Sequence, residues 1–92
     1  MGTAIATITI MPVTPDVNLD DVQVKALEMI KAFAGDRETK IEIEPIAFGL
    51  KALKILFVMD EDKGSPDIVA EKIIAIEGVQ SAEVTDVRRA IG

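Results

Sequence analysis

The sequence predicts an α+β domain in which a four-stranded antiparallel sheet carries two helices on one face. Three observations predict it. Three segments have apolar residues at every second position, which is the period of a strand, and a fourth is a longer apolar run typical of an interior strand. Two other segments have them at the three- and four-residue spacing of a helix. The elements follow as strand, helix, strand, strand, helix, strand, so two βαβ halves, about 3–46 and 50–88, can share one core.

The first strand is predicted from Thr3 to Met11, where alanine and isoleucine on one face alternate with isoleucine and threonine on the other. Pro12 ends it. Asn18 predicts the start of a helix, because its side chain can cap the first turn, and Gly35 predicts the end. The apolar stripe of this helix comprises Leu19, Val22, Ala26, Met29, Ile30 and Phe33.

The second strand is predicted over residues 38–46, where isoleucine alternates with lysine and glutamate. Its charged face and Pro45 are typical of a strand at the edge of a sheet. Residues 50–59 form a longer apolar run and are predicted to be an interior strand. An acidic turn, residues 60–64, follows it.

Ser65 and Pro66 predict the second helix, with a capping hydroxyl and a proline at the first helical position. Its buried face is expected to contain Val69, Ile73 and Ile76. Gly78 is predicted to end it, and residues 79–87 form the last strand before a short basic tail. With right-handed crossovers, this order predicts the ferredoxin-like βαββαβ sandwich.

Length and composition favour one small domain spanning residues 1–92. Hydrophobic residues make up 49% of the chain, enough for one core. No apolar run reaches the roughly 18 residues of a membrane span, and the N-terminus lacks the layout of a secretory signal. There is no cysteine, so disulfides and thiolate metal sites are excluded. We therefore expect a cytoplasmic protein without a membrane partner.

The charges and the reactive side chains exclude several function classes. A net charge of −6 with one basic doublet argues against direct nucleic-acid binding. No histidine or cysteine can act as base or nucleophile, so we expect no enzyme, no catalytic residue and no cofactor. Glu42 and Glu44 share one strand face and are interpreted as solvated edge residues rather than an acid–base pair. The acidic turn is interpreted as solvated too, so no metal site is expected.

Residues 44–50 carry the most information about function. Phe48 lies between Pro45 and Gly49, at the join of two predicted strands, where the chain must reverse. A ring on such a reversal either fills the core or anchors an interface. Taken alone, Phe48 is expected in the core on general burial tendencies. Taken alone, the nearby Lys51 and the terminal arginines are expected to be ordinary solvated residues.

Taken together, these residues resemble a known family. The chain is similar to the guanine-nucleotide-exchange domain of translation elongation factor 1-beta in three collinear segments: PIAFGLKAL (45–53), DEDK (60–63) and VQSAEV (79–84). Single segments such as DEDK are weak signals, whereas the ordered set is specific. The remainder resembles the short archaeal form of the family, which consists of this domain alone and has the ferredoxin-like fold.

The resemblance implies release of GDP from the GTPase elongation factor 1-alpha, so that GTP can reload it. It implies a partner-binding site containing Phe48, Gly49 and Lys51, with the ring inserted into the GTPase. A family lysine that reaches the magnesium and phosphate region aligns with Arg89, and Arg88 is the alternative residue that shares or takes that role. We expect the ring and these cations to lie near each other, on a protein that is monomeric when free.

Two alternatives remain open from the residues alone. One is a small ligand-binding or dimerising regulatory module of the same fold, which would need a polar pocket between subunits. The other is an acylphosphatase-type enzyme. It is disfavoured because no phosphate-binding loop follows the first strand, where residues 11–15 read MPVTP.

Overall fold

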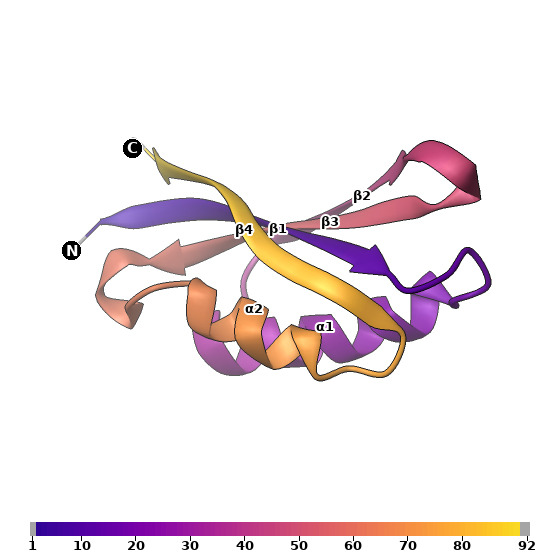
Figure 1. Cartoon of the computed structure of the whole chain (residues 1–92). Helices are drawn as coiled ribbons and strands as arrows, with labels where there is room; N and C mark the ends of the chain where they lie inside the picture. The colour runs from indigo at the N-terminus through magenta and orange to yellow at the C-terminus, as the bar shows by residue number, and fades with distance from the viewer. Residues whose placement is uncertain (1, 91–92) are drawn as a thin grey trace.

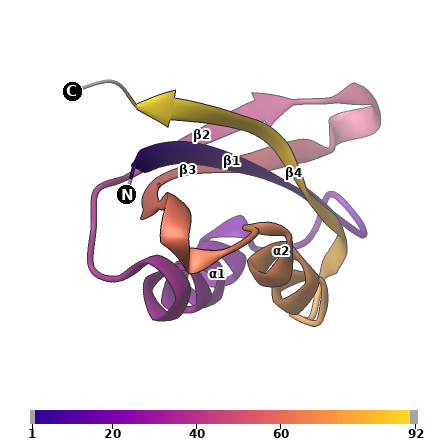
Figure 2. The ribbon, with the colours of Figure 1, turned by 90° about the vertical axis from the view of Figure 1, so that its left-hand side faces the viewer.

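The computed structural model describes residues 2–90 of the chain. Its strands and helices are β1 (Thr3–Pro12), α1 (Leu19–Ala34), β2 (Thr39–Pro45), β3 (Lys51–Asp60), α2 (Asp67–Ile74) and β4 (Val79–Ala90). The strands pair only in antiparallel fashion, in the order β2-β3-β1-β4. Both helices cover one face of the sheet and leave the other face open (Figures 1 and 2). The predicted ferredoxin-like α+β fold is confirmed.

The core lies between the sheet and the two helices. The alternation predicted for β1 is confirmed, because its alanines and isoleucines at positions 4, 6, 8 and 10 are all at most 5% exposed. Their partners on β3 face the helices as well, which gives one continuous apolar layer. The largest fully buried side chains are Phe57, Ile8, Ile10, Ile30, Leu53, Ile55, Ile73 and Val69.

The predicted start of α1 is confirmed in atomic detail, whereas α2 begins at Asp67, one residue later than predicted, with Pro66 as its N-cap. The Asp20 N–H donates to the Asn18 side-chain oxygen over 2.9 Å at the start of α1. The Asp67 N–H donates to the Ser65 hydroxyl over 3.2 Å at the start of α2. These side chains satisfy N–H groups that have no partner within the helix.

The helix ends differ in how well the sequence predicts them. Gly35 ends α1 as predicted, with a φ of 88° that favours glycine. In contrast, α2 ends at Ile74, before the predicted stop at Gly78. Beyond Ile74 the chain tightens into three-residue turns, as the Ile76 N–H donates to the Ile73 carbonyl over 3.0 Å. The residues up to Gly78 are therefore turned but not α-helical.

Strand β4 is longer than predicted, and a bulge divides it. The residues predicted as a basic tail, Arg88 and Arg89, pair with β1 inside the strand. The register shifts by one residue opposite Thr7 and Ile8, which leaves Thr85 as the extra residue. Because side chains alternate between faces, this extra residue reverses the faces of all later side chains in β4.

The open face of the sheet carries an ion pair between β2 and β3. The predicted edge position of β2 is confirmed by the sheet order. Lys54 pairs with Glu44 of this edge strand. The hydrogen bond to Glu44 and the negative charges of Glu44 and Glu42 raise the pKa of Lys54 above its usual 10.5.

Among the described residues, 2–90, neither helix has the length and apolar character that a membrane span requires.

Candidate functional site

The hairpin that joins β2 to β3 ends in a tight turn with an unusual backbone. The Leu50 N–H donates to the Ala47 carbonyl over 3.2 Å, and the Ile46 N–H donates to the Leu50 carbonyl over 2.7 Å. The two residues at the centre of the turn, Phe48 and Gly49, have φ angles of 62° and 80°. Positive φ at both positions is typical of a type I′ turn, whose twist suits a hairpin. Glycine adopts it readily, whereas left-handed backbone costs other residues about 1–2 kcal/mol.

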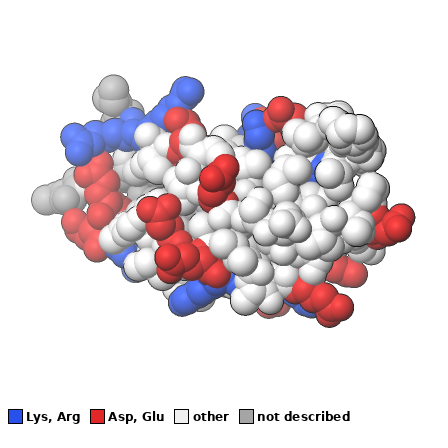
Figure 3. Space-filling view, in the orientation of Figure 1, with Lys and Arg blue, Asp and Glu red and all other residues white. Residues whose placement is uncertain are grey.

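This turn directs the Phe48 side chain into solvent, where 94% of its surface is exposed. The core position favoured by burial tendencies alone is therefore wrong. The neighbouring Ile46 is exposed as well. Figure 3 shows a largely uncharged surface over the hairpin end of the molecule. Exposed apolar side chains that gather in this way are typical of a protein–protein contact.

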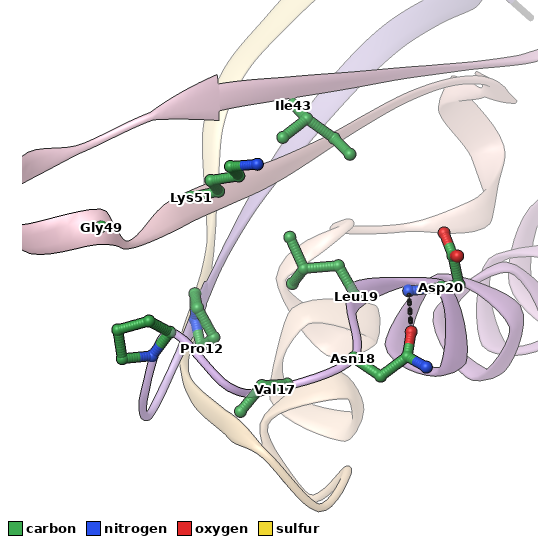
Figure 4. Close-up of a pocket in the computed structure, with 9 residues that line it drawn as sticks. Pro12, Val17, Asn18, Leu19, Asp20, Ile43, Gly49 and Lys51 are labelled. Atoms are coloured by element: carbon green, nitrogen blue, oxygen red, sulfur yellow. Dashed lines mark hydrogen bonds between the residues drawn. The ribbon is translucent and has the colours of Figure 1, made fainter.

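A groove of about 400 Å³ lies beside the hairpin (Figure 4). Gly49 and Lys51 line it from the hairpin, and Leu19 and Asp20 line it from the start of α1. The other lining residues are Pro12, Pro15, Val17, Asn18 and Ile43. Three of the predicted partner-binding residues, Phe48 among them, thus belong to the hairpin end of the molecule.

The arginine doublet lies at the other end of the sheet. Arg89 pairs with Ala4 at the start of β1, and the neighbouring residue Thr3 pairs with Asp60 at the end of β3. The hairpin turn precedes Lys51 at the start of β3. Strand β3 has 10 residues, so its two ends lie about 30 Å apart. The expectation that ring and cations lie near each other is therefore wrong, because antiparallel pairing brings the end of β4 to the strand ends farthest from the hairpin.

The two arginines face opposite sides of the sheet because consecutive strand residues alternate, and the bulge at Thr85 decides which arginine takes which side. Arg89 lies opposite Ala4, on the face that carries the helices, and Arg88 lies opposite Ile5, on the open face. Each arginine binds a carboxylate of this chain. The Arg88 Nε donates to Asp86 over 2.8 Å within the same strand.

Arg89 donates to Glu61, a residue far away in sequence. Its Nε lies 2.7 Å from Glu61 Oε1 and its Nη2 lies 3.4 Å from Oε2. The sequence predicts only a solvated acidic turn here, and the neighbouring Asp60 is likewise held by Arg37, over 2.8 Å. No sequence signal identifies Glu61, because its contact depends on the register of β4. In the described part of the chain, no group of three or more acidic side chains is arranged to hold a metal ion.

Comparison with known proteins identifies the family. Residues 5–90 match the family model of the EF-1 guanine nucleotide exchange domain. A protein called elongation factor 1-beta from Methanothermobacter thermautotrophicus is 44% identical over 97% of this chain and 98% of its own. The protein of that name from Pyrococcus horikoshii is 46% identical over 92% of both chains. The one from Methanococcoides burtonii is 37% identical over 99% of this chain and 100% of its own.

Solved structures agree on the fold. The designed protein Foldit4 has a TM-score of 0.63 at 17% identity and covers 98% of both chains. The BLUF protein BlrP1 has a TM-score of 0.57 at 11% identity, with 100% of this chain and 57% of that chain covered. At such low identity these similarities show the fold alone. The family match and the archaeal relatives show more: this chain acts in guanine-nucleotide exchange during translation elongation and belongs to the EF-1 guanine nucleotide exchange domain family.

Proposed function

We propose that the GTPase served by this chain is elongation factor 1-alpha, from which it releases GDP so that GTP can reload. The observation that carries this proposal is the Phe48 ring, held in solvent on a strained turn. Backbone strain and an exposed aromatic ring both oppose stability, so their combination indicates a function outside the fold. A binding partner provides that function.

At the hairpin end, Phe48 acts as an apolar anchor that enters a pocket of the GTPase. A buried aromatic at the centre of an interface commonly contributes about 2 kcal/mol or more. Gly49 allows the turn that projects the ring, since its own φ is also positive. Lys51, on the wall of the adjacent groove, supplies a charged contact beside the anchor.

At the other end, Arg88 and Arg89 act on the charges that hold the nucleotide. GDP is bound largely through its phosphates and the magnesium ion of the GTPase. A guanidinium brought beside that site competes with the cation for the same oxygens and so weakens the hold on GDP. Linkage requires that GDP weaken the binding of the exchange factor by the same factor.

The shape of the molecule suits a contact at both ends. Its extents are 42 × 21 × 18 Å, and the β2–β3 hairpin turn and the end of β4 lie near the two ends of the sheet (Figure 1). The end of β4 contains both arginines. A GTPase that touches both ends is held along the whole length of the sheet. The rigid strands then fix the distance between anchor and cations.

The proposed mechanism needs no covalent step, so the chain acts as a binding protein and not as an enzyme. We further propose a single domain, residues 1–92, that is monomeric when free and works in the cytoplasm without direct nucleic-acid contact. The molar mass of the free protein, measured by light scattering, checks that it is monomeric. A stable dimer would instead favour the dimerising regulatory module.

Release of fluorescent GDP from purified elongation factor 1-alpha tests the proposal. The expected result is faster release as this protein is added, up to a plateau, with no GTP hydrolysis required. Addition of excess unlabelled GDP alone gives the unstimulated rate. Release at that unstimulated rate over the whole titration would reject the exchange function.

A further inference from the structure

The contact between Arg89 and Glu61 is unequal, because the two side chains differ in how far they are exposed. The Glu61 side chain is 31% exposed, whereas that of Arg89 is 78% exposed. The Glu61 N–H donates to the Gly2 carbonyl over 2.9 Å, which ties the acidic turn to the chain just before β1. Glu61 is therefore the better anchored partner, and it holds a side chain that is largely exposed.

Gly2 provides the space for this arrangement. The Glu61 carboxyl group lies over the Gly2 α-carbon, so closely that a Cβ added at Gly2 would lie 2.8 Å from it. Real side chains do not tolerate that distance, so any larger residue at this position would move the carboxylate. The carboxylate is thus confined between the Gly2 backbone on one side and Arg89 on the other.

The geometry of the contact leaves part of the guanidinium available. A guanidinium has five N–H donors in a rigid plane. Glu61 takes the Nε–H and one hydrogen of Nη2, so three donors remain on the outer edge. Arg88 has no comparable support, since it makes one bond to Asp86, two residues away on the same exposed strand.

We propose that Glu61 is a positioning residue that orients Arg89 so that its outer edge meets anionic oxygen atoms of the partner. This inference rests on the proposed exchange function. It also assigns the cationic role at this end to Arg89 rather than Arg88. By holding one edge of the guanidinium in the free protein, Glu61 lowers the conformational entropy that the Arg89 side chain loses on binding.

Two substitutions test the role by different routes. Glu61→Gln removes the charge and the paired acceptor, and Gly2→Ala keeps the charge but displaces the carboxylate. Both are expected to slow stimulated GDP release, Glu61→Gln by roughly threefold to tenfold, as for a long side chain that must be ordered during binding. The melting temperature is expected to change little, because an exposed ion pair contributes little to stability.

Asp60→Asn serves as the matched control. It removes one negative charge from the same turn, but the Asp60 carboxylate is held by Arg37 and not by Arg89. If the acidic turn acted only through its charge, Asp60→Asn and Glu61→Gln would change release alike. Positioning predicts that only Glu61→Gln slows it. Equal effects of the two variants would overturn the proposal.

A double-mutant comparison links the effect to Arg89. In an Arg89→Ala background, Glu61→Gln is expected to have no further effect on release. The reversed pair, Glu61→Arg with Arg89→Glu, restores the ion pair but exchanges its ends. It should not regain release, because a carboxylate then stands at position 89, whereas a merely structural contact would regain it.

Four results would overturn the positioning role while leaving the exchange function intact. They are wild-type or faster release with Glu61→Gln, equal effects of Asp60→Asn and Glu61→Gln, an undiminished effect in the Arg89→Ala background, and full recovery by the reversed pair. A wild-type protein that fails to accelerate GDP release rejects the exchange function itself, and the positioning role with it. The two failures are therefore distinguishable.

Discussion

Phe48 and Arg89 lie at opposite ends of the same sheet. Phe48 precedes the first residue of β3, and Arg89 pairs with Ala4 beside the last residues of that strand. About 30 Å of extended chain separates them. One compact contact patch cannot include both residues, so a partner that uses both must span the molecule. This separation determines how substitutions at the two ends should combine.

Replacing Phe48 by alanine is expected to slow stimulated GDP release about 30-fold, the equivalent of about 2 kcal/mol for a lost aromatic anchor. The fold should be unaffected, since the ring is 94% exposed and leaves no cavity behind. Stopped-flow release of fluorescent GDP measures the first effect, and thermal unfolding measures the second. An unfolded variant, or one with full activity, would contradict the anchor role.

Phe48→Asn is expected to separate stability from activity. Asparagine followed by glycine is the preferred pair for a turn with two positive φ angles. The substitution should therefore raise the free energy of unfolding by about 0.5–1 kcal/mol, because the left-handed backbone strains phenylalanine more. GDP release should slow as in Phe48→Ala. Chemical denaturation of the three proteins checks this, and an asparagine variant no more stable than the alanine variant would contradict the strained turn.

Removing both terminal charges, in Arg88→Ala/Arg89→Ala, is expected to reduce stimulated release by at least tenfold, the loss of one or two charge-assisted hydrogen bonds. The dependence of release on ionic strength should weaken as well, because fewer charges contribute to association. Release measured at several salt concentrations tests both effects. Arg88→Lys/Arg89→Lys is the control that keeps the charge. If the double alanine variant stimulates release like the wild type, the electrostatic part of the mechanism is wrong.

The Lys54–Glu44 pair predicts an alkaline loss of stability. Folding raises the pKa of Lys54. The contribution of the pair to stability is therefore complete below pH 10.5 and declines as the pH rises through the higher pKa of Lys54 in the folded protein. The chain has no tyrosine or cysteine to titrate in this range. The difference in free energy of unfolding between wild type and Lys54→Gln should therefore shrink above pH 10.5. A difference that stays constant would show that Lys54 and Glu44 do not interact in solution.

Much of the fold is predictable because its signals are local. The alternation in β1 reflects one buried face, and the caps at Asn18 and Ser65 each depend on a hydrogen bond to an N–H two residues away. The end of α2 is harder to predict, since the chain continues from Ile74 to Gly78 in hydrogen-bonded turns that are not α-helical. Burial tendencies fail for Phe48 because they average over positions, whereas its exposure follows from this particular turn.

The arrangement of the candidate site is less predictable because it depends on register. The sequence indicates a doublet at Arg88 and Arg89 but not which face each occupies, since one extra residue at Thr85 reverses the faces. The contact with Glu61 depends on that reversal. The distance between Phe48 and the arginines likewise follows from strand pairing, which no short motif encodes.

Stimulated GDP release compared across four proteins addresses the proposed two-ended contact: wild type, Phe48→Ala, Arg88→Ala/Arg89→Ala and the triple variant. Substitutions so far apart should contribute independently, so the logarithmic losses of the first two variants should sum to that of the triple variant within about 0.5 kcal/mol. The two-ended contact would be contradicted by a triple variant that is no slower than Phe48→Ala or Arg88→Ala/Arg89→Ala. A wild-type protein that leaves the rate of GDP release unchanged would contradict it as well.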